Sequence, residues 1–256
     1  MSVWNGFRAK NYRGQKLPAI LGLVAIAPGA IVGLFAGLAI VTGQGGSLDA
    51  AAWISLAGSL LVFASGLMDD LMPSGPRGLR GHLRAVASGH VTTGILKLVV
   101  IAGSSVVVVA AQPVHPGATR LAGVVLLAGC ANLWNGLDVR PGRALKSFVL
   151  AAGAVLVAGV PMRLAPTVPG VLLGAIIALP ADLRERAMLG DGGSNLLGFT
   201  AGLGLYLVLP APWVWVAAAV AVTLNVLAET VTLSRMVDAV GPVRWFDRLG
   251  TVSAPD

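Results

Sequence analysis

Long apolar segments, separated by short polar connections, fill almost the whole of this 256-residue chain. Runs of roughly 20 apolar residues are long enough to cross the hydrocarbon core of a bilayer as helices. The sequence has no series of alternating segments typical of barrel strands, and lipid requires a backbone that satisfies its own hydrogen bonds. We therefore predict about eight transmembrane helices, at residues 17–42, 51–68, 91–111, 117–134, 144–162, 166–181, 194–210 and 212–234.

The composition agrees with a single membrane domain over residues 1–256. Hydrophobic residues make up 56% of the chain and charged residues only 11%, whereas about a quarter of a soluble domain is charged. The 34 glycines fit this class of protein, because small residues let membrane helices approach one another closely. The fold class that we expect is all-α, a polytopic integral membrane helical bundle without a sizeable soluble domain.

The charges of the connections predict the orientation of the bundle. The longer connections hold 14 of the 18 Lys and Arg residues, and Lys97 and Lys146 lie just inside adjoining helices, whereas Arg120 and Arg163 fall on the opposite side. Basic loops remain in the cytoplasm, so we expect both termini there and a multi-pass protein of the plasma membrane. The predicted cytoplasmic segments are 1–16, 69–90, 135–143, 182–193 and 235–256. This topology accounts for the net charge of +7 without a nucleic-acid partner.

Four aspartates stand at the cytoplasmic ends of the predicted spans. Asp69 and Asp70 follow the second span, Asp138 follows the fourth, and Asp191 precedes the seventh. Acidic side chains at the edge of a bilayer are costly and tend to mark function. Mg²⁺, or Mn²⁺ in its place, prefers oxygen ligands such as one or two carboxylates with phosphate oxygens. The four positions together predict a divalent-cation site that handles phosphates, although any one of them alone is typical of a solvated helix end.

Two further features accompany these aspartates. Lys97 lies about two turns inside the third span, where it either snorkels to the interface or pairs with an anionic pocket. The segment Leu189–Asn195 is rich in glycine around Asp191. Glycine lets a backbone approach a ligand, and free N–H groups at the start of a helix favour anions. Basic residues suited to a diphosphate occupy the same face: Arg77, Arg80, His82, Arg84, Arg140 and Arg143.

Three motifs carry a family resemblance. The segments are Gly66-Leu67-Met68-Asp69-Asp70, Asn132-Leu133-Trp134-Asn135-Gly136-Leu137-Asp138 and Met188-Leu189-Gly190-Asp191-Gly192-Gly193-Ser194. In this order, the motifs resemble those of the polyprenyl-phosphate N-acetylhexosamine-1-phosphate transferase superfamily (glycosyltransferase family 4), which includes the phospho-MurNAc-pentapeptide translocase and the GlcNAc-1-phosphate transferases. Weaker similarities lie at Asn11–Gly14 and at Glu229–Thr230.

The chain also departs from this family's pattern. Members usually have ten spans, so this chain resembles a short member that lacks the first and the last. Asn135 stands where the family has aspartate, and the His-rich motif of the last cytoplasmic loop is absent from the tail Gly241–Arg248. Arg244 and Arg248 are candidates to replace the lost imidazoles as phosphate contacts. Trp245 either stacks on a base or sugar or anchors the tail at the interface.

The resemblance implies a reaction and assigns roles. A Mg²⁺-dependent enzyme would move a sugar-1-phosphate, such as an N-acetylhexosamine-1-phosphate, from a UDP-sugar to polyprenyl (undecaprenyl) phosphate and release UMP, in cell-envelope polysaccharide synthesis. The predicted catalytic residues are Asp69, Asp70, Asp138 and Asp191, with Asp138 and Asp191 as metal ligands. The predicted substrate-binding residues are Lys97, Asn132, Asn135, Gly192, Arg244 and Arg248. The Gly- and Ala-rich spans are also compatible with a homodimer. Two alternatives stay open: a non-catalytic relative that acts as a membrane binding or regulatory partner, and a transporter.

Overall fold

The computed structural model describes residues 8–10, 16–41, 49–72, 85, 87–89, 92–230 and 233–251. Within these residues the chain is almost entirely helical, and a short antiparallel hairpin precedes the first helix, with Arg8 opposite Pro18 and Lys10 opposite Lys16. The strands are β1 (Arg8–Lys10) and β2 (Lys16–Pro18). The long helices are α1 (Leu21–Val41), α2 (Ala50–Leu71), α4 (Thr93–Ala111), α5 (Thr119–Leu137), α6 (Arg143–Val157), α7 (Thr167–Leu183), α8 (Gly190–Val208) and α9 (Ala211–Thr230). Two short helices, α10 (Leu233–Ala239) and α11 (Gly241–Arg248), follow them.

Each predicted span coincides with one long helix, and the differences at the ends have local causes. The segment predicted at 144–162 ends as α6 at Val157, because Gly159 adopts a left-handed conformation with φ of 83° and Pro161 follows; neither favours continuation of a helix. The helix predicted from residue 194 begins at Gly190, so the glycine-rich segment is the first turn of α8. Asp69 and Asp70 belong to the last turn of α2, not to the connection after it.

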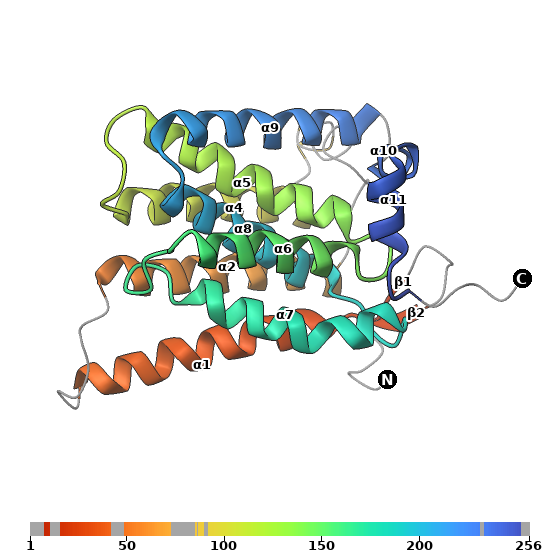
Figure 1. Ribbon diagram of the computed structural model, residues 1–256, viewed down its shortest axis with the longest axis horizontal. Coiled ribbons are helices and arrows are strands. Elements are labelled where there is room, and N and C mark those ends of the chain that lie inside the picture. Colours follow the sequence, from red (N-terminus) through yellow and green to blue (C-terminus); the bar gives the residue numbers. More distant parts are fainter. Residues whose placement is uncertain are drawn as a thin grey trace, which may run out of the picture.

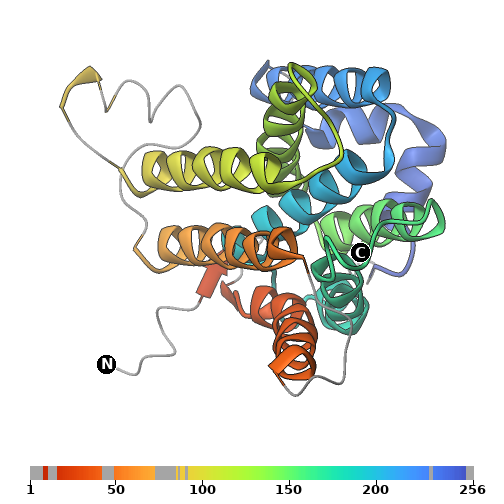
Figure 2. The ribbon, with the colours of Figure 1, turned by 90° about the vertical axis from the view of Figure 1, so that its left-hand side faces the viewer.

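The bundle is built around α8. Two views at right angles place α8 in the middle of the other long helices (Figures 1 and 2), and it packs against α1, α2, α5, α6 and α7. Most residues of α8 are buried on all sides. Its serine, asparagine and glycines therefore face protein and not lipid, which removes the cost of polar groups in hydrocarbon.

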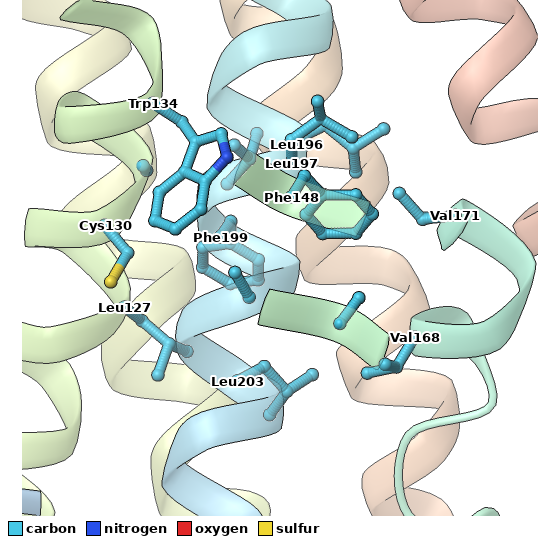
Figure 3. Packing of buried hydrophobic residues seen from close by; sticks show 14 of the residues in the cluster. Leu127, Cys130, Trp134, Phe148, Val168, Val171, Leu196, Leu197, Phe199 and Leu203 are labelled. Carbon is cyan, nitrogen blue, oxygen red and sulfur yellow. The ribbon is translucent and has the colours of Figure 1, made fainter. Parts of the chain in front are cut away.

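The core lies where α8 meets α5, α6 and α7. Figure 3 shows the aromatic rings of Phe148 and Phe199 beside Trp134, Leu127 and Leu203, all of them buried. Small residues bring the helices close: a side chain at Gly198 would collide with the carbonyl of Cys130 on α5, which is itself buried. The abundance of glycine thus serves close helix packing, as the composition suggests.

Four of the described helices, α2, α4, α5 and α9, are long and apolar enough to cross a membrane by their length and composition. The helix α9 packs mainly against α5 and leaves Trp213, Trp215 and Val226 exposed. In water such a surface would be costly, whereas lipid chains cover it without penalty. The chain is therefore a helical protein of membrane type.

The long helices alternate in direction, so that the ends of α2, α5 and α7 meet the starts of α4, α6 and α8. Contacts between Asp69 and Lys97, between Asn135 and Ser194, and between Gly142 and Asp182 connect these ends. The hairpin, α10 and α11 lie at this same end of the bundle, on the right of Figure 1. The short helices run across the direction of the long ones there.

Candidate active site

The three motifs meet at this end of the bundle. Asp69 and Asp70 are in the last turn of α2, Asp191 is in the first turn of α8, and Asp138 follows the last residue of α5. Close approach of α2 and α8 makes this possible: a Cβ atom at Gly66 would lie 2.6 Å from the carbonyl oxygen of Asp191. The glycine of the first motif therefore allows the carboxylates of the first and third motifs to lie together.

Lys97 joins two of these carboxylates. Its Nζ atom donates to Asp69 Oδ2 at 2.8 Å and to Asp191 Oδ2 at 2.5 Å. The hydroxyl of Thr93, one turn earlier on α4, donates to the other oxygen of Asp69. The side chain of Lys97 is only 9% exposed and that of Asp191 is 34% exposed. Lys97 thus lies among the carboxylates, the second of the two placements considered from the sequence, and the side chain of Asp191 stays partly exposed.

Asp70 caps the start of α8. Its two carboxylate oxygens accept the backbone N–H groups of Asp191 and Gly192, at 3.0 and 3.2 Å. A carboxylate at a helix N-terminus satisfies free amides and interacts favourably with the helix dipole. Gly190, just before them, has φ of 70°, and a Cβ there would lie 2.7 Å from Asp70 Oδ2. The glycine-rich segment therefore binds an anion that belongs to the protein itself.

Asn135 and Asn132 point to different neighbours. The side-chain oxygen of Asn135 accepts from Ser194 Oγ at 3.1 Å, which ties the end of α5 to the first turn of α8. Asn132 is exposed and donates to Asn225 on α9. Gly192 is buried against α2, where a Cβ would lie 3.0 Å from the backbone of Leu67. Of these three predicted substrate contacts, Asn135 and Gly192 have bonds at the α8 end of the site, Asn135 to Ser194 and the backbone N–H of Gly192 to Asp70.

Asp138 lies beside this cluster. Burial raises the pKa of its carboxyl well above the usual range, and the negative charges of Asp182, Asp191 and Asp70 raise it further. Asp182 was not among the predicted site residues. It is buried at the end of α7 and accepts the backbone N–H of Gly142 at 2.7 Å. Its position in the sequence could have identified it as a candidate: like the predicted aspartates, Asp182 lies at the end of an apolar segment, on the basic side of the bundle.

Two arginines that were assigned to a diphosphate have other partners. Arg143 is buried and forms a two-pronged ion pair with Asp247 of α11, at 2.7 and 2.8 Å. Arg140 forms a similar pair with Asp238 of α10. Their guanidinium groups hold the C-terminal helices on the bundle in this structure.

Lys146 completes this contact between α6 and α11. Its ammonium donates to the carbonyl oxygens of Phe246, Asp247 and Leu249 at the end of α11. A cation there interacts favourably with the negative end of the helix dipole. Burial raises the pKa of Asp247, but its hydrogen bonds and ion pair with Arg143 lower it further, so the net pKa is below the usual value. We call Arg143, Lys146 and Asp247 the α6–α11 clamp.

The remaining predicted residues are more dispersed. Arg244 and Arg248 lie on the exposed side of α11, and Arg244 donates to the carbonyl oxygen of Asp238. Other predicted contacts lie outside the described residues: Arg77, Arg80, His82, Arg84 and the segment 11–14.

The chemistry of the cluster follows from its charges. Four aspartates lie at or beside the cluster. Among the described residues, Lys97 forms ion pairs with two of them, Asp69 and Asp191. No group of three or more His, Cys, Asp or Glu side chains within the described residues is arranged to hold a metal ion. One or two carboxylates with substrate phosphates and water are, however, the usual ligands of Mg²⁺, and Asp191 is exposed enough to take part. The donor chemistry therefore fits a divalent cation shared with a phosphate ligand.

Comparisons of this chain with protein-family models, curated proteins and solved structures find no match.

Proposed function

We propose that this protein is a membrane phosphoglycosyl transferase, which moves a sugar-1-phosphate from a UDP-sugar to a polyprenyl phosphate and releases UMP. The observation that carries this proposal is the convergence of Asp69, Asp70, Asp191 and Lys97 from three helices at one end of the bundle. Buried or half-buried carboxylates at a membrane edge are expensive. A phosphate-handling site gives them a use that packing alone does not.

The proposed topology has eight spans with both termini and the site in the cytoplasm, in the plasma membrane. Its support is the distribution of charge. Arg140, Arg143 and Lys146 lie at the end of the bundle that carries the aspartates, whereas Arg163 pairs with Asp49 before α2, at the opposite end. Positive charges favour the cytoplasmic side. The donor, a soluble nucleotide sugar, would reach the site from there.

In this proposal the residues of the cluster divide the work. Asp69 or Asp70 orients the acceptor phosphate, whose second pKa near 6 leaves it mostly ionised at neutral pH without a strong base. Its oxygen attacks the phosphorus atom bonded to the sugar, and the bond from that phosphorus to UMP breaks. Lys97, held by two carboxylates, supplies a fixed positive charge beside the phosphates. Asn135, Asn132, Gly192, Arg244 and Arg248 remain the predicted substrate contacts.

A divalent cation is part of the proposal. Asp191 and Asp138 are the residues that would hold Mg²⁺, with Mn²⁺ as a substitute. When bound, the ion would neutralise negative charge on the diphosphate as the leaving group departs. The residues themselves contribute orientation: Asp191 is fixed by Lys97, and its backbone N–H is held by Asp70.

The test is UMP release by the purified protein, supplied with undecaprenyl phosphate, Mg²⁺ and a panel of UDP-sugars. We expect UMP with one donor, only when lipid and metal are both present, and about 10²–10³-fold less from the Asp191→Asn protein. UMP release that does not depend on the lipid would contradict the transferase and indicate a hydrolase. Silence with every donor, from folded protein, would favour the non-catalytic alternative.

One observation favours that alternative as a second candidate. Lys97 neutralises part of the charge of Asp69 and Asp191, and Asp70 already caps α8, so these groups also stabilise the bundle. A purely structural cluster predicts that Asp191→Asn lowers the melting temperature and changes no nucleotide binding. A transporter is less favoured, because its charged groups should lie near the middle of the bilayer.

A further inference from the structure

The helix α11 has two chemically different sides. Residues one turn apart share a face of a helix, which places Arg244 and Arg248 together. Trp245 lies on the adjoining face of α11 and Leu249 directly follows the helix, so apolar side chains are neighbours of the two arginines. An amphipathic helix with basic residues beside an aromatic one is the type that lies in the membrane interface.

The clamp decides which side of α11 faces outward. Asp247 is buried against Arg143, and the carbonyl of Phe246 accepts from Lys146. The outward side therefore carries Trp245, which is 67% exposed, and Leu249, which is 49% exposed. These are large apolar groups that stay uncovered although the helix is firmly held.

The direction of α11 suits a position at the interface. It runs across the long helices at the end of the bundle in Figure 1, so a membrane that contains the long helices has α11 parallel to its surface. A surface hollow of about 430 Å³ lies beside it, lined by Arg244, Trp245, Arg248, Leu249 and Gly250 together with Gly241. Two cations and two apolar side chains thus border one open hollow.

We propose that α11 is an interfacial helix that binds the headgroup of an anionic phospholipid. Arg244 and Arg248 contact the phosphodiester in the hollow, while Trp245 and Leu249 insert among the acyl chains. The same arginines were predicted to contact the nucleotide sugar. A nucleotide diphosphate needs their charge but not the exposed apolar side chains, whereas an anionic interface uses both. This inference does not depend on the transferase chemistry.

The test measures which lipids lie in contact with Trp245, from the quenching of its fluorescence. The full chain is reconstituted in phosphatidylcholine vesicles that contain either brominated phosphatidylglycerol or the same amount of brominated phosphatidylcholine. The emission of Trp245 is obtained as the difference between the wild-type protein and Trp245→Phe. We expect stronger quenching by the anionic lipid, since two interfacial arginines at about 1 kcal/mol each favour an anionic surface roughly 30-fold. The preference should weaken as salt is added.

The matched variants separate this site from general charge effects. Arg244→Gln/Arg248→Gln should lose the preference for the anionic lipid, whereas Arg184→Gln/Arg186→Gln, with the same change of charge in the connection before α8, should keep it. Asp191→Asn should also keep it, so failure of the proposed reaction leaves this result intact. Equal quenching by both lipids, or equal loss in both double variants, would overturn the proposal. Loss of the preference on addition of UDP with Mg²⁺ would also overturn it, because Arg244 and Arg248 would then bind the nucleotide and not the lipid.

Discussion

The carboxylate cluster and the α6–α11 clamp lie at the same end of the bundle, yet they use charge in different ways. In the clamp, Arg143 meets both oxygens of Asp247, and Lys146 donates to three carbonyl oxygens. In the cluster, Asp69 and Asp191 share the one ammonium of Lys97, and Asp191 stays partly exposed. Within the described residues, the clamp matches one carboxylate with one guanidinium, whereas two carboxylates of the cluster share one ammonium. This is the difference that we expect between a structural contact and the proposed site for a cation and phosphates.

The largest expected effect comes from breaking the clamp. Arg143→Met leaves the carboxylate of Asp247 buried without its main partner, and loss of one member of a buried pair costs about 3–5 kcal/mol. We expect a clear fall in the melting temperature in detergent. Arg143→Met/Asp247→Leu should recover much of it, because no charge is then left unpaired. Arg163→Met, which removes an exposed pair with Asp49, should cost at most about 1 kcal/mol. Equal losses in the two single variants would remove the distinction between them.

The second largest effect is expected in the carboxylate cluster, on activity and not on stability. Asp191→Asn should reduce UMP release about 10²–10³-fold, the usual range for loss of one electrostatic contact in an active site, while the protein stays folded. Turnover and melting temperature are measured on the same preparation. Asp49→Asn, at the opposite end of the bundle, should leave turnover unchanged. Near-normal turnover of Asp191→Asn would rule out its role as a metal ligand.

The paired aspartates should lose activity for two different reasons. Asp69→Asn removes a carboxylate partner of Lys97, and Asp70→Asn weakens the cap of α8. We expect about 10²-fold lower UMP release in each, the lower end of the range of positioned acid–base groups. Asp70→Asn should in addition lose about 0.3–1 kcal/mol of stability from the helix terminus. Wild-type rates in both variants would refute the assignment of a function to the pair.

The smallest effect is a pH dependence of the clamp. The pKa of Asp247 is lower in the folded protein than in the unfolded chain, so its ionised form favours folding. That contribution is complete above the unfolded pKa of about 4 and is lost as the pH falls through the folded value. Melting temperatures between about pH 6 and pH 3 should therefore fall less steeply for Arg143→Met/Asp247→Leu than for the wild type. Identical slopes would show that the pair does not couple to folding.

The sequence predicts the helices well because each one carries its own signal. Eight apolar runs become eight helices, and the aspartates of all three motifs come to one end of the bundle because the helices alternate in direction. The hairpin β1–β2 escaped the prediction, since three-residue strands carry almost no pattern. The helices α10 and α11 lie largely in the segment 235–256, which was predicted only as a cytoplasmic connection; α11 starts at Gly241 and Pro242, residues that usually interrupt helices.

Partnerships between distant residues were not predictable in the same way. Arg143 and Asp247 are separated by 104 positions, and nothing in the local sequence distinguishes Arg143 from a cation that only sets the topology. The role of Gly192 was equally hard to predict. A glycine beside an aspartate suggests a phosphate-binding loop, but close packing against Leu67 is a second reason for a glycine at this position. Charge type and place are encoded locally, whereas the choice of partner depends on the whole fold.

The central position of α8 has a consequence for the order in which the protein is made. Every helix that packs closely against α8, namely α1, α2, α5, α6 and α7, precedes it in the chain. When α8 leaves the ribosome, its partners have already been synthesised. A segment with Asp191, Ser194 and Asn195 is a poor substrate for insertion on its own, but it can enter against helices that are already in place. Synthesis from the N-terminus thus delivers this helix, with its polar first turns, only after the bundle can shelter it.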